Sequence, residues 1–296
     1  MSKSSKVKPV IPCSRTPEAM ARVEAYAEEL LIAAPGIGSH GLLPEEFEAA
    51  GLLQSAIERL RGRRAATMDV KKAFILRVLE RLQEVGRIES SAFTGSGNRH
   101  DYTARLPGGR TAIIEAKGCL DGNNTTIYQR PANADEFLIW SLCQNPGADP
   151  RHNVWSGIHT RLGAKIVAER ERIEALIVWD MLCGSAARPC PKLIAGNRGR
   201  VLHGKTLPPP CIYLFPRTVP DPRDNPEPPV WQLSELPFLL ALAEEFDCPP
   251  QETVEVHIQA RSKGTDVERQ TTLVRAGITL HQSNWTKLRR ASRTGF

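Results

Sequence analysis

Three residues of this chain combine types and spacing that could do chemistry: an aspartate, then a glutamate and a lysine two positions apart. Asp101 opens one predicted strand, and after thirteen intervening residues Glu115 and Lys117 end the next strand. Residues two apart on a strand point to the same face, so Glu115 and Lys117 are neighbours there. Two carboxylates can hold Mg²⁺, and a lysine beside the ion can orient a water and stabilise developing negative charge. The set suits hydrolysis of a phosphodiester.

The two strands are predicted to form a hairpin around the Pro-Gly-Gly-Arg segment 107–110. In an antiparallel pair, the residue numbers of directly opposite partners add up to one constant value. Asp101 lies on the same face as Glu115 only if that value is even. A three-residue loop over 108–110 provides such a pairing and places Thr103 opposite Glu115. A two-residue loop would put the carboxylates on opposite faces unless a bulge intervenes.

Hydrophobic periodicity predicts the elements around this hairpin. A helix precedes it, and continuous apolar runs of the kind buried on both faces of a sheet follow it. Together they predict an α/β protein with a central mixed β-sheet flanked by helices. The predicted helices are 68–85, 134–143, 156–172 and 233–246, and the predicted later strands are 175–179, 211–215, 254–260 and 267–274.

Composition changes along the chain suggest an order of segments. A core with extensions at both ends is expected, with a helical extension before it and a small β-rich part after it. The expected segments are a basic tail 1–16, a helical extension 17–66, a core 67–216, a Pro-rich linker 217–232 and a C-terminal helix with a β-hairpin region 233–296.

Charge points towards a nucleic-acid partner. The 296 residues carry 39 Lys and Arg against 33 Asp and Glu, a net charge of +6, and 28 of the basic residues are arginines. Arginine forks match phosphate oxygens and guanine edges, although codon usage also favours arginine over lysine. No apolar run is long enough to span a bilayer and no secretion signal is evident, so a cytoplasmic location is expected.

The segment from Asp101 to Glu115-Ala116-Lys117 resembles the PD-(D/E)XK signature of the restriction-endonuclease-like nuclease superfamily, in the expected order of helix, strand, hairpin and strand. The resemblance covers about 68–216 as architecture and three residues as motif. His100 stands where the pattern usually has proline.

The resemblance implies specific roles and a cofactor. Asp101 and Glu115 would ligate Mg²⁺, and Lys117 would assist the water. The superfamily often adds an acidic residue from the helix before the first strand, and Glu84 or Glu80 matches that position. A surface hairpin with a Glu-Lys pair is the alternative interpretation.

Polar residues after the lysine are candidates for DNA contacts, because amide, aromatic and guanidinium groups read base edges or clamp phosphates. The same residues also suit turns, or a helix start with a packed tryptophan. The candidates are Asn123, Asn124, Tyr128, Gln129 and Arg130 in the loop, and His159 and Arg161 in the next predicted helix.

The function favoured by the sequence is a Mg²⁺-dependent type II restriction endonuclease that cuts double-stranded DNA. A two-fold symmetric site would imply a homodimer, and a companion DNA methyltransferase would protect the host. The alternatives are a structure-specific repair or recombination nuclease and a non-catalytic DNA-binding protein on a nuclease-like scaffold. Cys183, Cys190 and Cys211 are spaced too loosely for a typical zinc site, and buried thiols are preferred.

Overall fold

The computed structural model describes residues 68–94, 100–117, 130–143, 154–180, 200–202, 205–207 and 209–288. The expected tail 1–16 and helical extension 17–66 lie outside these residues.

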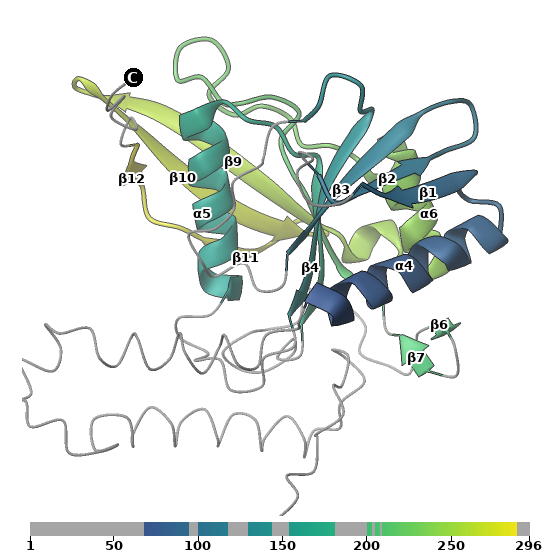
Figure 1. Ribbon diagram of the computed structural model, residues 1–296. Coiled ribbons are helices and arrows are strands. Elements are labelled where there is room, and N and C mark those ends of the chain that lie inside the picture. The colour runs from purple at the N-terminus through teal and green to yellow at the C-terminus, as the bar shows by residue number, and fades with distance from the viewer. Residues whose placement is uncertain are drawn as a thin grey trace, which may run out of the picture.

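Three α-helices, two 3-10 turns and twelve strands make up the described part of the chain (Figure 1). No helix among these residues is long and apolar enough to cross a membrane. The helices are α4 (Met68–Glu84), α5 (Val154–Glu169) and α6 (Pro237–Glu245), and the turns are η2 (Leu233–Glu235) and η3 (Pro250–Glu252). The strands are β1 (Ser90–Phe93), β2 (Tyr102–Arg105), β3 (Thr111–Lys117), β4 (Glu136–Cys143), β5 (Ala175–Asp180), β6 (Arg200–Leu202), β7 (Lys205–Leu207), β8 (Cys211–Leu214), β9 (Val254–Lys263), β10 (Asp266–Arg275), β11 (Ile278–Gln282) and β12 (Thr286–Lys287).

Ten of the strands form one mixed sheet in the order β1-β2-β3-β4-β5-β8-β9-β10-β11, with β12 also paired to β10. The hairpin strands β1, β2 and β3 are antiparallel, whereas β3, β4 and β5 run parallel to one another. Strand β8 is antiparallel to β5, and β9 continues the sheet parallel to β8. The expectation of an α/β protein with a central mixed sheet is confirmed.

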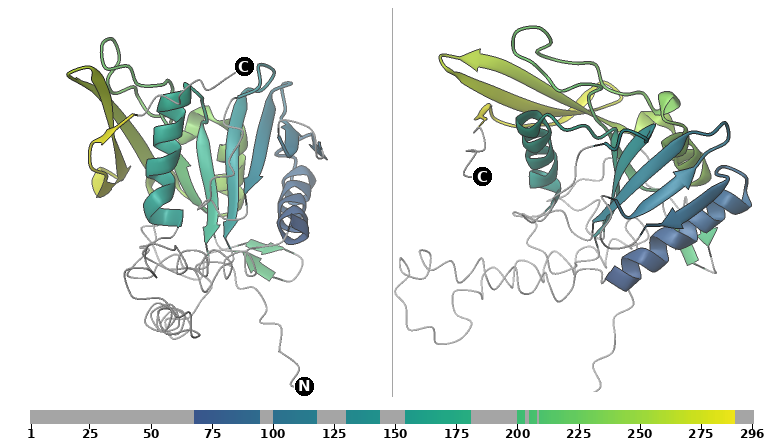
Figure 2. Two further views of the ribbon diagram at one scale, coloured as in Figure 1. Left: turned by 60° about the vertical axis from the view of Figure 1, so that its left-hand side comes forward. Right: turned by 45° about the horizontal axis from the view of Figure 1, so that its top comes forward.

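Helices pack against part of each face of this sheet (Figure 2). Helices α4 and α6 pack with one hydrophobic cluster, which includes Ile114 and Trp140, and α5 packs with a second cluster, which includes Ile113 and Ile139. Ion pairs link α4 and its C-terminal turn to α6: Arg81 contacts Glu245 at 2.9 Å, and Arg87 contacts Glu244 at 2.8 Å. The sheet is therefore buried on both sides where β3, β4 and β5 run together.

The segment 134–143 was predicted as a helix, and that prediction is wrong. It forms β4, a central strand whose side chains from Glu136 to Ser141 are all buried. A short apolar run that is buried on both faces shows neither the helical nor the alternating period clearly. Pairing with β3 and β5 on its two sides satisfies its backbone and decides the conformation.

The register of the hairpin differs by two from the predicted register. Thr103 pairs with Ile113, so paired numbers sum to 216 and the sum is even as required. The turn has three residues, but they are Pro107, Gly108 and Gly109, closed by a hydrogen bond of 2.9 Å from the Leu106 N–H to the carbonyl oxygen of Arg110. Gly108 and Gly109 have φ of 85° and 79°, a conformation that glycine adopts without strain.

The Pro-rich segment expected as a linker folds back along the sheet. Within 217–232, the Arg217 N–H donates to the carbonyl oxygen of Pro229 at 2.8 Å, and the carbonyl oxygen of Pro226 accepts from Ala260 in β9 at 2.9 Å. The loop is thus tied to β9.

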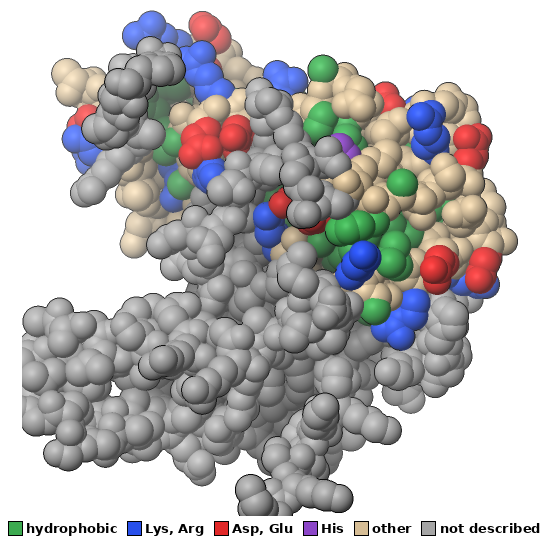
Figure 3. Space-filling view, in the orientation of Figure 1, with side chains coloured by type: hydrophobic (Ala, Val, Ile, Leu, Met, Phe, Trp, Pro, Cys, Tyr) green, Lys and Arg blue, Asp and Glu red, His purple; other side chains and the backbone are tan. Residues whose placement is uncertain are grey.

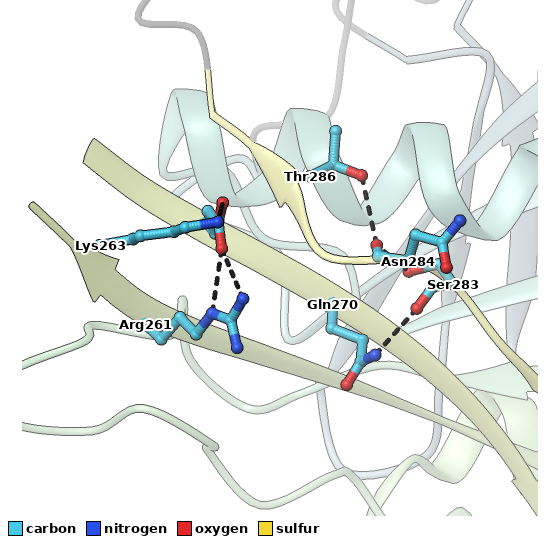
Figure 4. Close-up of polar contacts among 7 residues, drawn as sticks. Arg261, Lys263, Gln270, Ser283, Asn284 and Thr286 are labelled. Carbon is cyan, nitrogen blue, oxygen red and sulfur yellow. Dashed lines mark hydrogen bonds and ion pairs between the residues drawn. The ribbon is translucent and has the colours of Figure 1, made fainter.

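Strands β9 and β10 form a long hairpin whose exposed face carries a ladder of charges (Figure 4). Arg261 donates to Glu268 at 3.0 and 2.7 Å, and Lys263 pairs with the same carboxylate at 3.2 Å. At the end of β12, Lys287 pairs with Asp266 at 2.5 Å. These basic groups therefore have acidic partners within the hairpin.

Candidate active site

Glu115 and Lys117 lie at the end of β3 on the face that α5 covers. Their neighbour Ile113 belongs to the α5 cluster, and side chains alternate along a strand, so residues 113, 115 and 117 share that face. Glu115 is only 6% exposed. The Lys117 ammonium forms an ion pair with the Glu115 carboxylate. The predicted pairing of these two side chains is present.

Asp101 lies beside the same end of β3. Its Oδ2 accepts a hydrogen bond of 2.8 Å from the backbone N–H of Ala116, the amide that directly follows Glu115. Its own N–H donates to the carbonyl oxygen of Ile114 at 3.2 Å. The regular register would pair residue 101 with residue 115, so the chain bends locally here and turns the carboxylate towards β3. The Asp101 carboxylate is thus hydrogen-bonded to the peptide unit that joins Glu115 to Ala116.

The residues around Asp101 hold its strand end in place. Thr94 Oγ1 donates to the carbonyl oxygen of His100 at 2.6 Å, and His100 Nε2 contacts Thr103 Oγ1 at 3.0 Å. Burial lowers the pKa of His100, and the Asp101 charge opposes this. Burial raises the pKa of Tyr102 to about 12, and the Asp101 charge adds to that shift. Tyr102 therefore stays neutral beside the aspartate at ordinary pH.

The acidic residues expected from the preceding helix are not brought into this group. Glu80 and Glu84 lie on the exposed side of α4, and Glu84 contacts Arg81 at 3.7 Å. Within the described residues, no group of three or more His, Cys, Asp or Glu side chains is arranged to hold a metal ion. Asp101 and Glu115 are the two carboxylates that the described structure supplies at this strand end.

One polar residue at this strand end was missed by sequence reasoning. Ser141 in β4 pairs in register with Lys117 of β3 and is fully buried. The helix predicted for 134–143 hid it. A serine that directly follows the apolar run ending at Trp140 would have been the signal, had the run been interpreted as a strand.

Of the candidate DNA-binding residues, Arg130 is described with its contacts. Its Nη1 pairs with Glu174 at 3.0 Å and donates to the carbonyl oxygen of Asp135 at 3.2 Å. Glu174 is buried and also accepts from the Phe137 N–H at 2.5 Å, so Arg130 has a structural partner. Burial raises the pKa of Glu174, and the Arg130 charge opposes the shift.

The remaining candidates lie outside the described side chains. Asn123, Asn124, Tyr128 and Gln129 fall in 118–129, and His159 and Arg161 belong to α5 with side chains that are not described. Cys183 and Cys190 are also outside, whereas Cys211 in β8 is buried and forms no disulfide with another described cysteine.

Charged side chains of both signs are interspersed on the described part of the face shown in Figure 3. Several basic side chains are paired with carboxylates, as the β9–β10 hairpin illustrates. The net charge of +6 is therefore not gathered into one basic patch among the described residues of this face.

Comparison of this chain with protein-family models, with curated proteins and with solved structures finds no match.

Proposed function

We propose that this protein is a Mg²⁺-dependent endonuclease of the restriction-endonuclease-like kind. The observation that carries the proposal is the hydrogen bond of 2.8 Å between Asp101 Oδ2 and the Ala116 N–H, which brings the aspartate beside Glu115 and Lys117. A carboxylate, a second carboxylate and an ammonium at one strand end match the three residues of the D-x13-E-x-K signature. The order of α4, β1 and the β2–β3 hairpin followed by the parallel strand β4 supports the fold assignment.

The donor set fits a hard divalent cation. Asp101 and Glu115 offer carboxylate oxygens, the ligands that Mg²⁺ prefers, and Mg²⁺ completes its shell with waters and substrate phosphate. A bound Mg²⁺ would polarise the phosphate and lower the pKa of a coordinated water. Two protein carboxylates suffice for such a site because Mg²⁺ retains several waters.

The chain's own residues have separable roles in this proposal. Glu115 holds Lys117 through the ion pair, which keeps a nearly buried ammonium in place. Lys117 orients the attacking water and stabilises the negative charge that develops on the phosphate oxygens. The Ala116 N–H holds the Asp101 carboxylate in a single orientation, so less ordering is needed when substrate binds.

Double-stranded DNA is the proposed substrate, and the proposed class is the type II restriction endonucleases acting as homodimers. The net charge of +6 and the 28 arginines support a polyanionic partner. A symmetric recognition sequence read by two copies would allow each subunit to cut one strand.

Incubation of the purified full chain with unmethylated phage DNA, with Mg²⁺ or with EDTA, tests the proposal. Discrete fragments that require Mg²⁺ are the expected result, and Glu115→Gln should yield none. Glu244→Gln, an exposed carboxylate on α6, is the matched control that should cut like the natural protein. Salt-sensitive DNA binding without any product would contradict the enzyme assignment. Cleavage confined to junctions, flaps or mismatches would replace restriction by structure-specific repair.

A further inference from the structure

Ser141 is a buried polar residue that the site described above does not use. Its side chain is 0% exposed. Its Oγ has no hydrogen-bond partner among the residues that the structure describes. An unpaired buried hydroxyl costs free energy that alanine or another apolar residue would avoid. Its presence at a strand end with two carboxylates and a lysine points to a ligand.

Register places this hydroxyl beside Lys117. Ser141 pairs with Lys117 across β3 and β4 and with Val178 across β4 and β5. Paired residues on parallel neighbours share a face, and Val178 belongs to the α5 cluster. Ser141 therefore lies on the same face as Glu115 and Lys117, one strand away, at a strand spacing of about 4.8 Å.

A bridging water would join these groups without a direct contact. Ser141 Oγ and Lys117 Nζ form no hydrogen bond with each other. A buried water needs two to four polar partners, and the Lys117 ammonium, the Ser141 hydroxyl and the Glu115 carboxylate lie around one strand end. An ammonium has three N–H donors, and Glu115 takes one of them.

We infer that Ser141 and Lys117 together hold one water, and that this is the water consumed by the proposed hydrolysis. The inference rests on the proposed function. The water accepts from Lys117 Nζ and donates to Ser141 Oγ, which leaves a lone pair to face phosphorus. The reaction forms a bond between the water oxygen and phosphorus and breaks the bond from phosphorus to the leaving oxygen. On balance, one proton of the water ends on the leaving oxygen.

Ser141→Ala separates this role from a structural one. The variant lacks the hydroxyl that would bind the water, so activity should fall. It also lacks an unpaired buried polar group, so stability should stay the same or rise. We expect kcat for Mg²⁺-dependent cleavage to fall about 10- to 100-fold, with KM for DNA unchanged. The melting temperature of the metal-free, DNA-free protein should be equal to or above that of the natural protein.

Thr271→Val is the matched control, because Thr271 is also fully buried but its hydroxyl accepts from Arg269 at 3.2 Å. Its loss should lower the melting temperature and leave kcat unchanged. Ser141→Ala cutting at the natural rate would overturn the inference alone. So would a lowered melting temperature with activity restored at lower temperature, because that marks a structural role. If the natural protein forms no Mg²⁺-dependent product, the proposed function fails and the inference falls with it.

Discussion

Glu136 and Phe238 are joined by a hydrogen bond of 2.8 Å, in which the Glu136 carboxylate accepts from the backbone N–H of Phe238. The same carboxylate accepts from Leu239 at 3.3 Å. Both donors belong to the first turn of α6, whose own N-cap residue, Leu236, supplies no side-chain acceptor. A strand residue thus caps a helix that lies 102 positions later in the chain.

Replacing this carboxylate should change how stability depends on pH. Burial raises the pKa of Glu136 from 4.5 to about 7, although the two N–H groups oppose the shift. The folded-state pKa is higher than the unfolded-state value, so the folded protein holds the Glu136 proton more tightly. The contribution of this proton to folding stability is full below pH 4.5 and is lost as pH rises through about 7. Glu136→Gln cannot titrate, so its free energy of unfolding should gain about 3 kcal/mol relative to the natural protein between pH 4.5 and pH 8.

Urea denaturation at several pH values measures that difference. Glu244→Gln, on the exposed side of the same helix, should run parallel to the natural protein. Parallel curves for Glu136→Gln as well would show that Glu136 does not bind a proton in this range.

Asp101→Asn should separate charge from hydrogen bonding. The amide oxygen can still accept from the Ala116 N–H, so the strand end should keep its conformation and its melting temperature. The negative charge that would hold Mg²⁺ is lost, so cleavage should fall by about 100-fold or more. Rates with saturating Mg²⁺, together with thermal melts, check both parts. Undiminished cleavage by Asp101→Asn would remove this residue from the metal site.

Lys117→Met should destabilise the protein as well as inactivate it. Glu115 is 6% exposed, so its carboxylate would lose the Lys117 ammonium while it stays in a poorly solvated position. Breaking a buried pair on one side costs about 3 kcal/mol. The double variant Glu115→Gln/Lys117→Met should recover most of that loss, because no buried charge remains. A double-mutant cycle in urea measures the coupling, and strictly additive effects would contradict a buried pair.

Gly163→Ala should destabilise the protein, although alanine is the better helix former. A Cβ at this position of α5 would lie 2.9 Å from Thr271 Oγ1 and 3.3 Å from Ile258 Cδ1. The helix would have to move away from β9 and β10, at a cost of about 1 to 3 kcal/mol. Propensity alone would stabilise the helix by about 1 kcal/mol. The sign of the change in chemical denaturation therefore tests how closely α5 packs on these strands.

The β2–β3 hairpin shows which features can be predicted from local sequence and which cannot. The Pro-Gly-Gly segment predicted a turn. The requirement that paired residue numbers have an even sum predicted which registers place Asp101 on the same face as Glu115. The register itself was wrong by two, because Gly108 and Gly109 both adopt positive φ and the turn closes at Leu106 and Arg110 rather than one position later. Turn chemistry fixes the type of loop more readily than its exact end.

Long-range contacts decide what local patterns leave open. The run from Phe137 to Trp140 was predicted to be helical. Its own residues carry no signal that β3 and β5 pair with it on both sides. Glu136 similarly acquires its role from α6, far along the chain. Arg130 was a candidate for DNA, but its partner Glu174 becomes visible only when the sheet brings them together.

The aromatic pair behind the site has a practical consequence. Trp140 and Trp179 stack with ring centroids 5.1 Å apart and planes at 21°. Both lie near the C-terminal ends of their strands, β4 and β5. Because side chains alternate, the pair lies on the opposite side of the sheet from Ser141, separated from it by a single peptide unit of β4. Stacked indoles couple optically, so this pair would act as a chromophore that reports movement of these strand ends from the face opposite Glu115 and Lys117.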